Sequence, residues 1–191
     1  MLTEKFEHAL IYTLRLHRDQ TRKGTKIPYF AHLMSVAALV LESGGDEEMA
    51  IAALLHDAVE DQGGTGTLVE IRELFGERVA MIVEGCTDAF ESPKPPWRSR
   101  KEAYLDHLST APAEVRLVSL ADKLHNARSI LSDLLQNGIH TMNRFKGGVA
   151  GTVWYYQQLL GVFRQHNDSP MIDELDRVVS EIVSLLNLSK P

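Results

Sequence analysis

Four ionisable side chains end an otherwise apolar segment at residues 50–61. The segment reads Ala-Ile-Ala-Ala-Leu-Leu and continues with His56, Asp57, Ala, Val, Glu60 and Asp61. This pattern predicts a largely buried helix, in which a charge costs several kcal/mol unless it is paired or bound to a metal. His56 and Glu60 are four residues apart, as are Asp57 and Asp61, so both pairs follow one side of the helix. Three carboxylates this close raise one another's pKa, and the cluster therefore calls for a cation or a substrate.

Two further apolar segments carry residues of the same kind. Asp122 interrupts a run of apolar residues at 115–124, and His125 and Asn126 follow it on the same helix face. His32 has apolar neighbours on both sides. A lone histidine in a helix is more often a hydrogen-bonded core residue, and that interpretation is favoured for His125. Together, these segments offer imidazoles and carboxylates but no thiolate, a donor set that suits divalent transition metals.

Helical spacing of apolar residues extends over most of the chain and predicts an all-α fold. No run of alternating apolar and polar residues is long enough to indicate a sheet. We expect a single compact multi-helix domain over residues 1–191. The predicted helices cover residues 3–20, 28–41 and 46–61, and four more begin near Thr67, Ser99, Pro112 and Pro170.

Composition limits the class of protein. The 191 residues include 20 Lys and Arg and 26 Asp and Glu, and the resulting net charge of −6 disfavours a general nucleic-acid binder. The single cysteine, Cys86, favours a reducing compartment. The longest uncharged run, Gly147–Phe163, holds four glycines and is interpreted as a buried or half-buried helix. We therefore expect a cytoplasmic protein that binds neither nucleic acid nor membrane; the sequence makes no prediction of its oligomeric state.

The order His32, His56–Asp57 and Asp122 resembles the H…HD…D pattern of the HD-domain phosphohydrolases. The sequence around these residues is more specific and is similar to the hydrolase domain of the RelA/SpoT alarmone enzymes. The matching segments are Pro28-Tyr-Phe-Ala-His32, Leu55-His-Asp-Ala-Val-Glu-Asp61 and Leu120-Ala-Asp-Lys-Leu-His-Asn126. Glu60 and Asp61 complete the HDxxED signature of that group, and the chain is shorter than the enzymes that also carry a synthetase.

This resemblance implies a small hydrolase that removes the 3′-pyrophosphate of (p)ppGpp and releases GDP or GTP and pyrophosphate. It implies Mn2+ as the cofactor, although Fe2+, Co2+ and Zn2+ also suit the donor set. The expected metal ligands are His32, His56, Asp57 and Asp122. Glu60 and Asp61 are the expected catalytic residues, which orient or deprotonate the attacking water. The alternative role for one of them is to fix the tautomer of a histidine.

The substrate implied by the resemblance is a highly anionic nucleotide, so the site needs local positive charge. Residues 15–26 contain five Lys or Arg and one Asp, a local sum of +4. Within this run, Arg22 and Lys23 match basic positions that contact the nucleotide in the family. Asn126 matches a polar residue near the nucleotide, and Ser129 stands where a hydroxyl often faces the base.

Three alternative functions are compared with this one, and the number of histidines argues against the second, an oxygenase. The same metal site could act on (p)ppApp or on the 2′-phosphate of NADPH. A two-metal HD oxygenase would need additional histidines between Asp57 and Asp122, where only His107 is present. The alternative outside enzymes is a non-catalytic nucleotide-sensing module.

Overall fold

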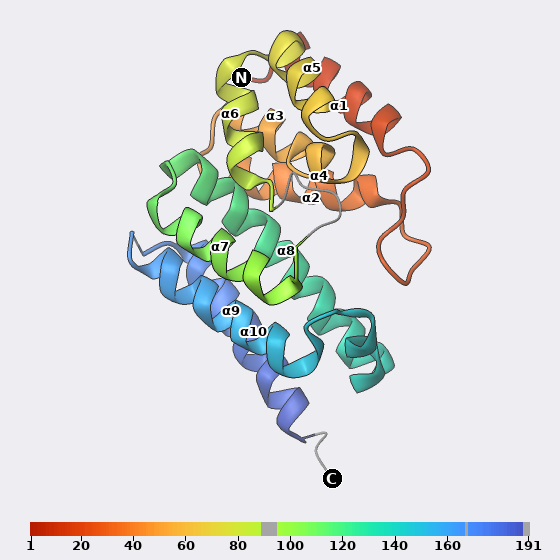
Figure 1. Ribbon diagram of the computed structural model, residues 1–191, viewed down its shortest axis with the longest axis vertical. Coiled ribbons are helices and arrows are strands. Elements are labelled where there is room, and N and C mark those ends of the chain that lie inside the picture. Colours follow the sequence, from red (N-terminus) through yellow and green to blue (C-terminus); the bar gives the residue numbers. More distant parts are fainter. Residues whose placement is uncertain (89–94, 167, 189–191) are drawn as a thin grey trace. The chain divides into compact units, whose positions relative to one another are not determined.

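The computed structural model describes residues 1–88, 95–166 and 168–188 and confirms the all-α prediction (Figure 1). Within these ranges the chain forms ten α-helices and one 3-10 helix, and no strand. The only sheet-like feature there is an isolated antiparallel bridge between Thr21 and Pro28. The chain divides into two compact units, Met1–Pro95 with Ala111–Asp122, and Pro96–Thr110 with Lys123–Pro191. The expectation of a single domain over residues 1–191 stays a prediction.

The first unit is built around a buried central helix. Its helices are α1 (Glu4–Leu16), α2 (Tyr29–Glu42), α3 (Glu47–Leu55), α4 (Ala58–Gln62), α5 (Thr65–Phe75), α6 (Glu77–Cys86) and the first part of α8 (Ala113–Asn137). Helix α3 packs against α1, α2 and α6, and all six residues from Ala50 to Leu55 are fully inaccessible to solvent. Because this part of α3 is buried on every side, His56, which follows its last residue, also lies in the interior of the unit.

The prediction of one helix over residues 46–61 is wrong, because the helix is interrupted at His56 and Asp57. The Nδ1 atom of His56 lies 2.8 Å from the carbonyl oxygen of Ala53. In an uninterrupted helix that carbonyl accepts from the backbone N–H of Asp57, so the imidazole offers it a competing donor. A short helix, α4, then carries Glu60 and Asp61 and ends at Gly63, whose φ of 147° is accessible only to glycine at low cost.

Three other predicted helix ends also differ from the structure. Helix α1 ends at Leu16 instead of residue 20, and α7 (Trp97–Thr110) begins before Ser99. Helix α5 begins at Thr65, so Thr67 lies inside it, and its hydroxyl donates to the carbonyl oxygen of Gln62 over 3.3 Å. A threonine hydroxyl bonded back to a preceding carbonyl does not cap a helix N-terminus, which explains why the capping-box pattern misplaced this start.

The second unit contains α7, the remainder of α8, the 3-10 helix η1 (Ile139–Arg144), α9 (Gly148–Arg164) and α10 (Pro170–Leu188). Helix α9 contacts α7, α10 and η1. It contains most of the uncharged run 147–163, and its buried residues include Tyr155, Tyr156 and Phe163, which confirms the prediction of a half-buried helix. None of the helices in the described ranges is both long and apolar enough to span a bilayer.

Candidate metal centre

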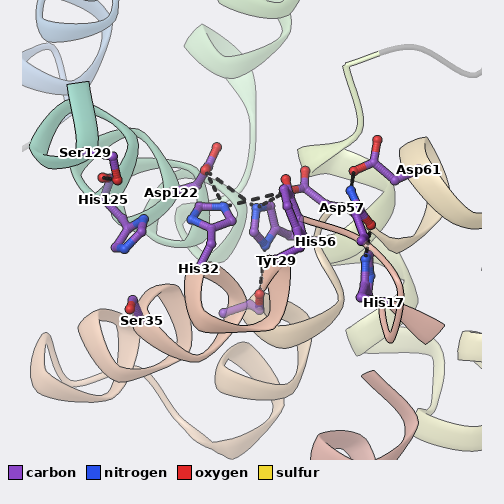
Figure 2. A network of polar contacts seen from close by, with 12 residues as sticks. His17, Tyr29, His32, Ser35, His56, Asp57, Asp61, Asp122, His125 and Ser129 are labelled. Carbon is purple, nitrogen blue, oxygen red and sulfur yellow. Dashed lines mark hydrogen bonds and ion pairs between the residues drawn. The ribbon is translucent and has the colours of Figure 1, made fainter. Parts of the chain in front are cut away.

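Two imidazoles and two carboxylates from three helical segments meet inside the first unit (Figure 2). The Nε2 atom of His32 lies 3.2 Å from Oδ1 of Asp122 and 3.7 Å from Oδ2 of Asp57. The Nε2 atom of His56 lies 3.1 Å from Oδ2 of Asp57 and 3.6 Å from Oδ1 of Asp122. The structure therefore brings together all four residues that the sequence suggests as ligands.

Each of the four side chains is placed by a different part of the backbone. His32 lies in the first turn of α2, which Pro28 precedes, and His56 follows the last residue of α3. Asp57 occupies the break before α4, and Asp122 lies on a buried face of α8. The exposed fractions of the side chains are 0% for His32, 3% for His56, 8% for Asp122 and 21% for Asp57. The cluster is thus closed on the imidazole side and reaches solvent through Asp57.

The arrangement fits a single divalent cation. Ligand atoms bound at right angles around an ion at about 2.1 Å are about 3 Å apart, close to the shorter of the observed separations. A carbonyl only accepts, so the Nδ1 of His56 must donate to Ala53, and its Nε2 is left to bind a metal. That Nε2 is buried and makes no hydrogen bond among the described residues. Such an atom facing two carboxylate oxygens requires a positive charge between them, either a proton or a metal ion.

The electrostatics of the pair His56–Asp57 agree with this conclusion. Burial by itself lowers the pKa of the His56 imidazole, but the carboxylates of Asp57 and Asp122 outweigh it and raise that pKa well above its usual value. Burial raises the pKa of the Asp57 carboxyl, but His56 and His32 outweigh it and lower that pKa well below its usual value. A metal ion entering this cluster therefore replaces a proton.

Tyr29 also belongs to this polar network, although the sequence did not mark it as a site residue. Its hydroxyl donates to Oδ2 of Asp57 over 2.5 Å, and its ring lies edge-on against His32 at 5.4 Å between centroids. Burial and the nearby Asp57 raise the pKa of this hydroxyl, so it stays protonated and acts as a donor. The only signal in the sequence is its position three residues before His32 in the segment Pro-Tyr-Phe-Ala-His.

Replacing Tyr29 by Phe should therefore weaken metal binding without disturbing the ring packing. We expect the affinity for Mn2+ to fall about 10- to 100-fold, because the outer partner of a ligating carboxylate orients it. Isothermal titration of the metal-stripped variant measures this affinity. Tyr12→Phe is the matched control, since its hydroxyl bonds to Glu70 and not to the cluster. Equal Mn2+ affinities of the Tyr29→Phe variant and the unaltered protein would show that the hydroxyl does not orient Asp57.

Glu60 and Asp61 both lie on α4, one turn beyond Asp57, in the same unit. Glu60 is half-buried, whereas Asp61 is exposed and accepts a hydrogen bond from Nε2 of Gln20 over 2.8 Å. The partner that fixes the tautomer of His56 is a backbone carbonyl and not either carboxylate. Both acids thus lie on the short helix that follows the cluster, and their catalytic role stays a prediction.

The four residues expected to bind substrate have different surroundings. Arg22 is half-buried, with its guanidinium 5.5 Å from the centre of the Tyr29 ring, and Lys23 is exposed beside it. Asn126 and Ser129 are half-buried on the part of α8 that belongs to the second unit, where the Ser129 hydroxyl donates to the carbonyl oxygen of His125 over 3.0 Å. Substrate binding by these four residues stays a prediction.

Comparison with known proteins agrees with this helical fold and its His/Asp cluster. A family profile described as the HD domain matches residues 9–144. The chain therefore belongs to the HD-domain family. Hydrolases with this domain are metal-dependent, and the cluster of His32, His56 and Asp57, with Asp122 beside it, provides a possible site for the ion.

Individual relatives show more specifically which proteins this chain resembles. The chain is 39% identical over 125 residues to the guanosine-3′,5′-bis(diphosphate) 3′-pyrophosphohydrolase MESH1 of Xenopus tropicalis, covering 64% of this chain and 67% of that protein. It is 39% identical over 130 residues to the enzyme of the same name from Aquifex aeolicus, covering 66% of this chain but only 18% of that protein. A GTP pyrophosphokinase of Brucella melitensis is 38% identical over 125 residues, 64% of this chain and 16% of the relative. The chain thus spans less than a fifth of the length of the last two.

Solved structures give the same result. A metazoan orthologue of SpoT, reported to hydrolyse ppGpp, superposes with a TM-score of 0.79 at 26% identity, covering 95% of this chain and 97% of that one. A protein from Listeria monocytogenes superposes with a TM-score of 0.70 at 33% identity, covering 83% and 99% of the two chains. These similarities confirm the resemblance to the SpoT-type hydrolases that the sequence indicates.

Proposed function

We propose that this protein hydrolyses the 3′-pyrophosphate of (p)ppGpp, with Mn2+ as its preferred metal ion. The observation that carries the proposal is the convergence of His32, His56, Asp57 and Asp122, with Glu60 and Asp61 one turn away on α4. The family profile matches residues 9–144, which contain all six residues, and two relatives named for this activity are 39% identical to the chain over 125 and 130 residues. The proposal places the enzyme in the cytoplasm, with a free nucleotide as its partner.

In this proposal, His32, His56, Asp57 and Asp122 hold the metal ion. A divalent ion bound there supplies a Lewis acid that withdraws charge from a phosphoryl oxygen. Tyr29 keeps the Asp57 carboxylate oriented through its hydroxyl. Because His56 is fixed by Ala53 and buried, its Nε2 stays directed into the site. The protein thus holds its donors in place before the substrate arrives.

Glu60 and Asp61 act on the attacking water. A carboxylate one turn beyond the metal pair can accept the proton that water loses as its oxygen bonds to phosphorus. The bond from phosphorus to the ribose 3′ oxygen breaks, and the protonated carboxyl group can return the proton to that oxygen. The overall reaction consumes one water and releases GDP or GTP together with pyrophosphate. Arg22 and Lys23 supply positive charge for the phosphates, and the Tyr29 ring supports the guanidinium of Arg22.

The test is a direct assay of the protein with defined nucleotides. Protein stripped of metal and then supplied with Mn2+ is incubated with ppGpp, and the products are separated by anion-exchange chromatography. We expect GDP and pyrophosphate in equal amounts, and no product when the metal is left out. Parallel incubations with ppApp and NADPH test the alternative substrates, and faster turnover of either one would overturn the assignment to (p)ppGpp. Binding of ppGpp without turnover in the presence of Mn2+ would indicate a sensing module instead.

A further inference from the structure

A chain of polar contacts joins the end of α1 to Asp61. The Nδ1 atom of His17 lies 2.6 Å from Oε1 of Gln20, and Nε2 of Gln20 donates to Oδ2 of Asp61 over 2.8 Å. Gln62 donates to the same Oε1 of Gln20 over 2.6 Å. Figure 2 shows His17 and Asp61 within this network, beside Asp57 and Tyr29. All of these residues belong to the first unit.

The direction of each hydrogen bond follows from the carboxylate. An ionised Asp61 only accepts, so Gln20 must present its NH₂ group to it. The amide oxygen of Gln20 then faces His17, and His17 must donate from Nδ1. The orientation of the Gln20 amide therefore determines the tautomer of His17, in which Nδ1 carries the proton.

An apolar side chain at the position of His17 would be buried at a lower free-energy cost. The exposed fraction of His17 is 2%, its ring stacks on Tyr29 at 5.6 Å between centroids, and its buried Nε2 makes no hydrogen bond within the part of the chain that the structure describes. Burial lowers its pKa, which agrees with a neutral ring that donates only from Nδ1. A buried polar atom without a hydrogen bond is costly, so packing by itself does not explain a histidine at this position.

The backbone of Gln20 is fixed to the same region. Its carbonyl oxygen accepts from the backbone N–H of Tyr29 over 2.9 Å, next to the bridge between Thr21 and Pro28. Tyr29 in turn bonds to Asp57 through its hydroxyl. These contacts hold Gln20 at a fixed position relative to Tyr29, which orients the proposed metal ligand Asp57. The side chain of Gln20, in turn, contacts the Asp61 carboxylate.

We propose that His17 and Gln20 are positioning residues that orient the Asp61 carboxylate for the hydrolytic step. The proposal rests on the function proposed above, in which Asp61 acts on the attacking water. Gln20 reaches Asp61 directly, and His17 acts through Gln20 by keeping the amide from rotating. Neither residue touches the metal ligands' coordinating atoms or the substrate in this scheme.

The sharpest test is Gln20→Glu. The new carboxylate still accepts from His17 and Gln62, but it can no longer donate to Asp61 and its negative charge repels that carboxylate, so the contact that orients Asp61 becomes repulsive. We expect kcat for ppGpp to fall about 10- to 100-fold, whereas KM, bound Mn2+ and the thermal midpoint change little. Gln157→Glu, on the exposed side of α9, is the matched control and should behave like the unaltered protein. An unchanged kcat in Gln20→Glu would overturn the proposal.

Two variants of His17 separate positioning from packing. In His17→Asn, the amide nitrogen stands near the former Nδ1 and can donate to Gln20, so most of kcat should be kept. In His17→Leu, the packing is kept and the donor is lost, so kcat should fall as it does in Gln20→Glu. Equal activities of the Asn and Leu variants would contradict a role through the hydrogen bond.

A double-variant cycle with Asp61→Asn separates failure of this inference from failure of the proposed function. We expect Asp61→Asn to reduce kcat and the addition of Gln20→Glu to cause no further loss, since both remove one interaction. If Asp61→Asn is costly and Gln20→Glu is not, only the positioning role is wrong. If Asp61→Asn is as active as the unaltered protein, the catalytic role of Asp61 and this inference are both wrong, while metal-dependent hydrolysis stands. Absence of any ppGpp turnover by the unaltered protein overturns both proposals.

Discussion

Replacing Asp57 by Ala is expected to abolish hydrolysis of ppGpp and binding of Mn2+ together. Asp57 lies within 3.1 Å of His56 Nε2, accepts from Tyr29 and is the most exposed member of the cluster, where the substrate must approach. Loss of a partner behind a ligand already costs about 10- to 100-fold, so loss of the ligand itself should exceed about 1,000-fold. Initial rates with ppGpp and the metal content of the dialysed protein measure the two effects.

The control for this variant is Asp106→Ala, which removes an exposed carboxylate from α7. It should keep full activity and one equivalent of metal. Circular dichroism of both variants verifies that the helices are intact. If Asp57→Ala keeps its metal and its rate, the ion is held elsewhere and the proposed centre is wrong.

Glu60→Gln should separate metal binding from turnover. Glu60 is half-buried on α4, one turn from Asp57, but is not one of the four residues whose donor atoms converge. The amide has almost the same shape as the carboxylate and cannot accept a proton from water. We expect kcat to fall about 100- to 10,000-fold, as is typical for loss of a general base. The affinity for Mn2+ should stay within about threefold of the unaltered value, since no direct ligand is removed.

Rapid-mixing or steady-state kinetics with ppGpp, combined with titration of Mn2+, measure both quantities. Glu73→Gln on α5 removes an exposed carboxylate in the same way and should leave kcat unchanged. Loss of metal in parallel with activity would assign Glu60 to the metal site instead of to the water. Full activity would leave Asp61 as the remaining candidate for the base.

The class of fold and the four converging side chains could be predicted from the order of the amino acids. Helical periodicity is a local property, so the apolar faces of α2, α3 and α8 are visible in the sequence. A histidine or carboxylate inside such a face is also visible, because it violates the burial pattern around it. His32, His56, Asp57 and Asp122 were identified in this way and by their resemblance to the HD-domain pattern.

The contacts that hold those side chains in place depend on the tertiary structure and could not be predicted from the sequence. The break of the helix at His56 depends on an imidazole that competes for a backbone carbonyl, and the role of Tyr29 depends on α2 packing against the end of α3. The relay from His17 through Gln20 to Asp61 joins residues 44 positions apart, and nothing in their spacing brings them together. Periodicity tells which face of a helix is buried, but only the packing of one helix against another determines which atoms meet there.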